Sequence, residues 1–192
     1  MTELPEHLGG HKNRTHLDEG SLSHMQRMMN VKSMIDIGCG PGGMVKLANE
    51  MGITAQGIDG DWSVDRTGVN KDWITIHDYE KGPSPLGDKK FDLAWSCEFV
   101  EHVYEKYIPN FMPDFQRANF VVMTFAPVGK AGHHHVNCNT QEYWIDVFNQ
   151  YGFGYDPNMT RHIREATTMN IKGKAAPRKA FVKNNGLCFV KK

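Results

Sequence analysis

Short apolar runs alternate with amphipathic stretches along most of the chain. Most of these runs end at glycine, aspartate or proline, which is typical of buried strands followed by turns. The predicted strands are residues 34–37, 53–58, 73–76, 91–95, 120–125, 153–155 and 187–190. Apolar residues at helical spacing predict helices between them, over residues 18–30, 44–51, 140–151 and 159–170.

Two stretches give a less regular pattern. A further helix is expected to begin at Glu98 and to be interrupted by Pro109 and Pro113. Residues 173–183 are basic and are expected to form a loop. The alternation of strand and helix predicts an α/β fold with a parallel sheet, and ligands of such sheets bind at the carboxyl ends of the strands. We expect one domain over residues 34–192 and a helical N-terminal segment, residues 1–33, that can act as a lid.

Composition narrows the class of protein. The 192 residues include 22 Lys and Arg and 22 Asp and Glu, so the formal net charge is zero. This balance disfavours a protein whose main role is to bind nucleic acid. No apolar run reaches the roughly 20 residues of a membrane-spanning helix, and the polar start does not resemble a signal peptide. The four cysteines are scattered, and we expect a soluble cytoplasmic protein without a disulfide framework.

A glycine-rich turn follows the first predicted strand, and an acid ends the second. Gly38, Gly40 and Gly43 fit the G-x-G-x-x-G pattern of dinucleotide-binding turns. Asp59 is placed to accept hydrogen bonds from a ribose diol. Asp36, two residues before the first glycine, suits a cationic ligand such as S-adenosylmethionine better than a pyrophosphate. The residues alone leave both cofactors open.

The combination of these motifs with a later one resembles a known family. Residues 36–43, Asp59, Asp78 and the stretch 91–103 are similar to the motifs of class I S-adenosylmethionine-dependent methyltransferases. The small-molecule branch, which includes ubiquinone and menaquinone biosynthesis enzymes, is the most similar. The resemblance spans about residues 20–155. It implies a Rossmann-like sheet of seven strands, the last antiparallel, with helices on both faces.

The resemblance also implies which residues bind the cofactor. The glycine turn would contact its amino-acid portion, Asp59 its ribose and Asp78 its adenine. The full implied set is Asp36, Gly38, Cys39, Gly40, Gly42, Asp59, Gly60, Asp61, Trp62, Asp78, Tyr79, Ser96 and Cys97.

Candidate catalytic residues lie after the fourth and fifth predicted strands. If residues 98–102 are helical, Glu98 and His102 share a face, and His102 can be a packed side chain, a general base or, with Glu98 and Glu101, a weak metal ligand. His134 and His135 belong to a His-His-His loop, in which neighbouring side chains point to opposite sides. A role in binding or catalysis and a purely structural role both remain open for this loop.

We therefore expect transfer of a methyl group from S-adenosylmethionine to an oxygen or nitrogen of a small-molecule acceptor. The alternatives are an NAD-dependent oxidoreductase and a non-catalytic S-adenosylmethionine-binding or activator subunit. Nucleic-acid base methyltransferases of this family often carry an Asn/Asp-Pro-Pro-aromatic motif after the fourth strand. Residues 96–99 read Ser-Cys-Glu-Phe instead, so methylation of the amino groups of DNA bases is disfavoured. Basic residues near the C-terminus form either a solvated face or a surface for an anionic acceptor; they are Arg161, Arg164, Lys172, Lys174, Arg178, Lys179 and Lys183.

Overall fold

The computed structural model describes residues 3–170 and 179–192. Seven strands form one sheet in the order β3-β2-β1-β4-β5-β7-β6. β7 is antiparallel to both of its neighbours, and the other pairings are parallel. The strands are β1 (Ser33–Ile37), β2 (Thr54–Asp59), β3 (Ile74–Ile76), β4 (Phe91–Ser96), β5 (Ala118–Met123), β6 (Phe153–Tyr155) and β7 (Leu187–Lys191). The fold predicted from the sequence is confirmed.

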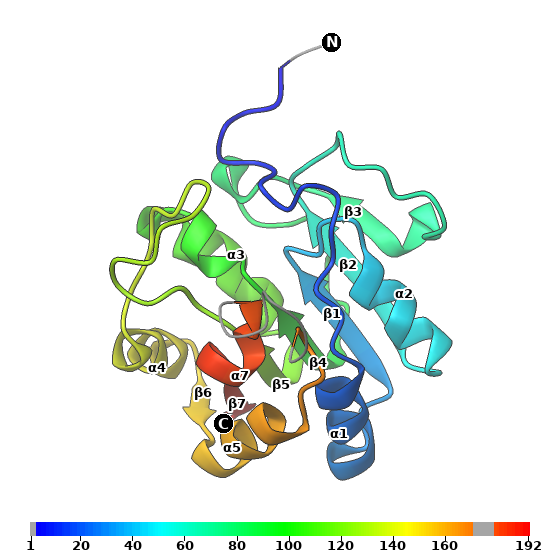
Figure 1. Ribbon diagram of the computed structural model, residues 1–192, viewed down its shortest axis with the longest axis vertical. Coiled ribbons are helices and arrows are strands. Elements are labelled where there is room, and N and C mark those ends of the chain that lie inside the picture. Colours follow the sequence, from blue (N-terminus) through cyan, green and yellow to red (C-terminus); the bar gives the residue numbers. More distant parts are fainter. Residues whose placement is uncertain (1–2, 171–178) are drawn as a thin grey trace.

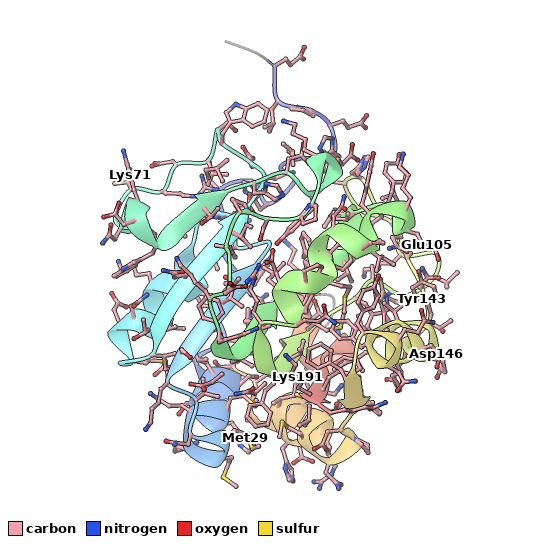
Figure 2. The ribbon with its side chains drawn as sticks, turned by 180° about the vertical axis from the view of Figure 1, so that it is seen from behind. Met29, Lys71, Glu105, Tyr143, Asp146 and Lys191 are labelled. Atoms are coloured by element: carbon pink, nitrogen blue, oxygen red, sulfur yellow. The ribbon has the colours of Figure 1, made fainter. Side chains whose placement is uncertain are left out.

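Helices cover both faces of the sheet (Figure 1). One apolar cluster packs α1, α2, α5 and α7 on one face, and an aromatic-rich cluster packs α3 and α4 on the other, which Figure 2 shows from behind. The helices are α1 (Glu19–Met29), α2 (Gly43–Glu50), α3 (Ile108–Phe115), α4 (Gln141–Gln150), α5 (Pro157–Ala166) and α7 (Phe181–Asn185). Short 3-10 turns are Lys71–Trp73, Tyr79–Lys81, Val100–His102 and Glu105–Tyr107.

Buried polar side chains fix the start of α1 against the far end of the chain. Asp18 is fully buried and caps α1 by accepting from the Ser21 N–H at 3.0 Å. The same carboxylate accepts from the Thr167 hydroxyl and the Thr168 N–H, just after α5. These bonds hold the end of the N-terminal segment, where it leads into α1, beside the sheet.

The structure corrects several expected elements. No α-helix begins at Glu98, where a 3-10 turn over Val100–His102 replaces it. Pro113 lies inside α3 and does not end it. Of the expected loop 173–183, residues 173–178 lie outside the described residues, whereas α7 contains the buried residues Phe181 and Val182.

The register of β1 directs its acid toward one face of the sheet. Side chains alternate along a strand, so Asp36 shares a face with Met34, which packs in the cluster of α1, α2, α5 and α7. Asp36 comes one residue before the end of β1. Its carboxyl group therefore lies at the carboxyl end of the sheet, on the side that the N-terminal segment crosses in Figure 1.

Candidate active site

A cavity of about 610 Å³ opens at the carboxyl ends of β1, β2 and β4. Residues of the N-terminal segment and of the 130–135 loop form its outer wall. Its size is within the range of roughly 300–1,000 Å³ typical of small-ligand sites. Of the residues implied as cofactor-binding, those that line it are Asp36, Gly38, Cys39, Gly40, Asp59, Gly60, Asp61, Asp78, Tyr79 and Cys97.

The glycine-rich turn has the backbone that only glycine adopts easily. Gly38, Gly40 and Gly42 all have positive φ angles, 76°, 50° and 82°. A side chain at Gly38 would overlap the Phe99 ring. Gly42 caps α2 and faces Val69 and Ile74, so it does not line the cavity.

Asp36 is a buried carboxyl group without a partner. It is 3% exposed, and no described residue donates a hydrogen bond to it or pairs with it. Burial, together with the negative charge of Asp59, raises its pKa to about 8. An unpaired carboxyl group lining a cavity is suited to a ligand that brings a positive charge.

Asp59 ties the glycine turn to the end of β2. Its carboxylate accepts from the backbone N–H groups of Gly40 at 2.7 Å and Asp61 at 2.8 Å. Burial raises its pKa, which these two bonds and the Arg66 guanidinium partly offset. Arg66 also donates to the carbonyl oxygens of Gly40 and Asp61. Sequence reasoning missed Arg66, because a lone arginine in a loop gives no pattern.

Two acids at this end of the cavity are bound by histidines of the N-terminal segment. His7 Nε2 lies 3.2 Å from Asp78 and His11 Nε2 lies 3.1 Å from Asp61. Burial raises the pKa of Asp61, but bonds from Ser63 and His11 outweigh it and lower the value overall. No local pattern indicates a role for these histidines, since their partners are distant in the chain.

Two other implied residues lie outside the cavity wall. Trp62 is 43% exposed. Ser96 is buried and donates to the Ile37 carbonyl at 2.9 Å, so it joins β4 to β1. Tyr79 does line the cavity, and its hydroxyl donates to the buried Asp114 carboxylate at 2.6 Å.

Glu98 follows β4 in a strained conformation. Its φ is 54°, a left-handed value that a glutamate adopts rarely and at an energetic cost. Its N–H donates to the Thr124 hydroxyl at 2.8 Å, which holds the bend against β5. Burial raises the pKa of the Glu98 carboxyl to about 7. The helical face expected for Glu98 and His102 does not exist, yet both side chains line the cavity.

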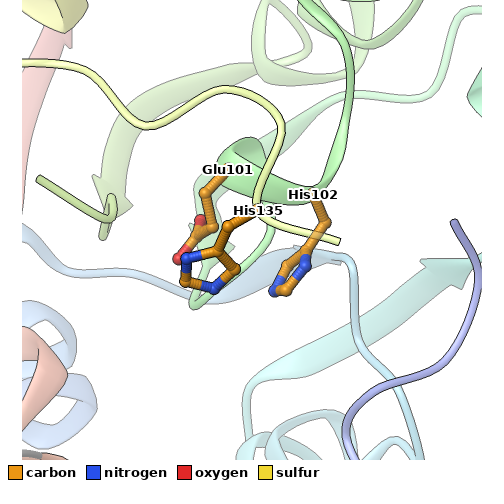
Figure 3. A group of neighbouring side chains, drawn as sticks. All are labelled: Glu101, His102 and His135. Carbon is orange, nitrogen blue, oxygen red and sulfur yellow. The ribbon is translucent and has the colours of Figure 1, made fainter. Parts of the chain in front are cut away.

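Glu101, His102 and His135 form a cluster beside Glu98. One possible ligand atom from each lies within 4.8 Å of the others. Figure 3 shows the three side chains projecting together from two segments, with Glu101 beside His135. Glu101 is fully buried, and among the described residues its carboxyl group meets another acid, Glu98, and no basic side chain pairs with it. Burial and then the charge of Glu98 raise its pKa well above the usual value.

Backbone bonds bring His135 to this cluster. The N–H groups of Val136 and Asn137 donate to the Glu101 carbonyl at 2.9 and 3.1 Å. His135 Nδ1 lies 2.8 Å from the Lys130 carbonyl, which can only accept, so Nδ1 carries the proton and Nε2 has a free lone pair. A side chain at Gly132 would overlap the His135 ring.

The other two histidines of this loop lie elsewhere. His133 Nε2 bonds to the Glu6 carbonyl at 2.9 Å and so contacts the N-terminal segment. His134 packs against Tyr104 and does not line the cavity. His102 does, and burial, followed by the nearby His135, lowers its pKa to about 4, so its ring is neutral at neutral pH.

Comparison with protein families gives the same fold assignment. Residues 35–118 match the family model described as "Methyltransferase domain". This stretch is similar to that family, and the sheet order is that of the Rossmann-like class I methyltransferase fold. The cofactor of this family is S-adenosylmethionine, and the matched residues include the glycine-rich turn, Asp59 and Glu98. A comparison with curated protein sequences gave no significant match.

Solved structures resemble the methyltransferase domain at low sequence identity. A TehB-like S-adenosylmethionine-dependent methyltransferase from Corynebacterium glutamicum has a TM-score of 0.60 and 17% identity, covering 90% of this chain and 88% of that one. Magnesium protoporphyrin IX methyltransferase from Synechocystis has a TM-score of 0.61 and 13% identity, covering 89% and 80%. The methyltransferase domain of bacterial CtHen1 has a TM-score of 0.55 and 20% identity, covering 71% and 84%. These likenesses establish the fold. Within the described residues, no helix combines the length and apolarity of a membrane span.

Proposed function

We propose that this protein transfers the methyl group of S-adenosylmethionine to an oxygen of its acceptor, and that a divalent cation at Glu101, His102 and His135 assists the transfer. The observation that carries this proposal is the fully buried Glu101 carboxyl group, which has no basic partner among the described residues and lies beside two imidazoles in the cavity of the glycine-rich turn. A buried anion needs a partner, and a cation supplies one.

The cavity wall fits the proposed cofactor. The ammonium group of S-adenosylmethionine would pair with Asp36, the unpaired buried acid. Gly38 and Gly40 would admit its amino-acid portion, Asp59 would accept from the ribose, and Asp78 would face the adenine. A nicotinamide dinucleotide would instead bring a pyrophosphate toward Asp36, which would have to stay protonated, because an ionised Asp36 would repel it.

The donor set fits a transition-metal or similar divalent cation. Two imidazoles and one carboxylate suit Zn²⁺, Fe²⁺, Co²⁺ or Mn²⁺. The bond from His135 Nδ1 to the Lys130 carbonyl is the kind of outer contact that orients ligating histidines. Such a cation lowers the pKa of a hydroxyl group bound near it. This is our reason for preferring an oxygen acceptor to a nitrogen acceptor.

Methyl transfer from a sulfonium is an in-line displacement that depends mainly on alignment. The acceptor oxygen forms the new bond to carbon while the carbon–sulfur bond breaks and S-adenosylhomocysteine leaves. Glu98, at the bend after β4, would receive the acceptor's proton. The N-terminal segment, which we propose as a lid, excludes water through its contacts with Asp61, Asp78 and the 133–135 loop.

The test combines metal analysis with methyl transfer. Purified protein is analysed for bound metal, then assayed with labelled S-adenosylmethionine against alcohols, phenols, amines and a short RNA. Each assay is run with a chelator and after restoring Mn²⁺, Mg²⁺, Zn²⁺ or Co²⁺. We expect products methylated on oxygen and a loss of activity with the chelator that a metal restores. Methylation of amines with no metal dependence would contradict the proposal.

The isosteric variant Glu101→Gln separates the cation from the cofactor. We expect it to lose metal and most activity and to keep its affinity for S-adenosylhomocysteine. Glu142→Gln, at an exposed position in the first turn of α4, is the matched control and should change neither. Binding of NAD instead of S-adenosylhomocysteine would overturn the cofactor assignment.

A further inference from the structure

Three basic side chains lie together on the cavity wall. Arg14 and His16 come from the segment before α1, and Lys179 lies just before α7. No described residue forms an ion pair with Arg14 or Lys179. Both side chains are exposed, so solvent or a ligand can reach them.

The position of this group is fixed by neighbouring contacts. The Thr15 hydroxyl accepts from the Gly43 N–H at 3.1 Å, which attaches the segment to the start of α2. The His16 ring packs edge-on against Phe181 of α7, with 4.8 Å between the ring centres. Arg14 and His16 are therefore held beside the glycine-rich turn, and Lys179 lies near them on the opposite segment.

Hydrogen bonding determines which nitrogen of His16 carries the proton. Asn170 Nδ2 lies 2.7 Å from the Lys179 carbonyl, which can only accept, so this amide atom is the nitrogen. The same nitrogen lies 3.0 Å from His16 Nδ1, which must therefore accept. The ring proton of the neutral imidazole is then on Nε2, and no described residue accepts a hydrogen bond from it.

The charges around His16 are all positive. Burial lowers its pKa, and the charges of Lys179 and then Arg14 lower it further, while the bond from Asn170 raises it. No carboxylate contributes to this balance. The site has three donor groups, two of them cations, and it faces a cavity.

We propose that Arg14, His16 and Lys179 form an anion-binding site that holds a phosphate or carboxylate group of a ligand during methyl transfer. Two sources share this chemistry: an anionic group on the acceptor and the carboxylate of the cofactor. The proposal rests on the proposed function for its place in the reaction. Binding of an anion can be measured without any methyl transfer, so the two ideas can fail separately.

The direct test follows the His16 ring by NMR, with its signal assigned through His16→Gln. Inorganic phosphate is added to the protein alone and to the protein saturated with S-adenosylhomocysteine. A bound anion removes the positive field, so the pKa of His16 should rise by about one unit or more. The Arg14→Ala/Lys179→Ala variant should lose this response, whereas Lys183→Ala, an exposed charge on α7 outside the cavity wall, should retain it.

Two comparisons identify which molecule carries the anionic group. If phosphate still shifts His16 in the S-adenosylhomocysteine complex, the anion belongs to the acceptor. If S-adenosylhomocysteine alone produces the shift and 5′-methylthioadenosine, which lacks the carboxylate, does not, the anion belongs to the cofactor. A His16 signal insensitive to both, or an equal response in the double variant, would overturn the proposal. Unchanged circular dichroism and melting of the variants would show that these results do not come from unfolding.

Discussion

Asp36→Asn should make the unliganded protein more stable at neutral pH. The pKa of Asp36 is about 8 in the folded protein, against an ordinary value of 3.8. Between these values the folded state holds a proton that the unfolded chain has lost, so the free energy of unfolding falls as pH rises. The slope is about 1.4 kcal/mol per pH unit, and the sum from pH 3.8 to 7 is about 4 kcal/mol. Asparagine has the same shape and does not titrate, so the variant avoids this loss.

The assay is urea unfolding of wild type and variant between pH 4.5 and 8. The two should have similar free energies of unfolding at the acid end, and the variant should gain steadily toward pH 8. Asp88→Asn, at an exposed position, is the control and should follow the wild type. A difference between Asp36→Asn and wild type that does not depend on pH would refute the burial argument.

The same carboxyl group links cofactor binding to proton release. At pH 7 about 0.9 of the Asp36 groups are protonated if the pKa is about 8. Pairing with the ammonium of S-adenosylhomocysteine would expel that proton. Calorimetry in buffers of different ionisation enthalpy should therefore detect release of nearly one proton from wild type, and none from this site in Asp36→Asn. Equal proton release by both proteins would place the ammonium elsewhere.

Three further changes test other parts of the site. Asp59→Ala should weaken S-adenosylhomocysteine binding by roughly 1.5–3 kcal/mol in calorimetry, because a charge-assisted hydrogen bond to the ribose is lost. Gly132→Ala should displace the His135 ring and reduce bound metal and activity while leaving cofactor affinity unchanged, which metal analysis and binding assays check. His7→Ala combined with His11→Ala should speed dissociation of S-adenosylhomocysteine in stopped-flow measurements, since the lid loses its two contacts with the acids; an unchanged rate would contradict a lid.

Local patterns sufficed to predict the sheet. Strands such as Phe91–Ser96 and Ala118–Met123 are buried runs that tertiary contacts reinforce, and Gly42 ends its turn with the left-handed backbone expected of glycine. The stretch after β4 was predicted wrongly as an α-helix. Helical spacing of Glu98 and His102 was a valid pattern, but the sharp bend at Glu98 and its bond to Thr124 override it. A contact between residues 26 positions apart leaves no periodic signal.

The same limit applies to the site. Asp36, Gly38 and Asp59 lie in local motifs, so the sequence could place them at one edge of the sheet. His135 reaches Glu101 only because the loop after β5 donates two backbone bonds to the Glu101 carbonyl. Nothing in the His-His-His stretch distinguishes His135 from His134, and geometry alone separates them.

The distribution of charge in the cavity indicates how ligands would be oriented. The pKa values of Asp36, Asp59, Glu98 and Glu101 are all raised by burial, so keeping these four acids ionised together is costly. Positive groups that occupy this end would replace protons and stabilise the fold, because binding to the native state alone adds to stability. The same cavity wall also carries Arg14 and Lys179, cations before α1 and α7 that favour negative groups. A ligand carrying both charges would therefore enter in one orientation, and reversing the charge at either end should cost both affinity and alignment for transfer.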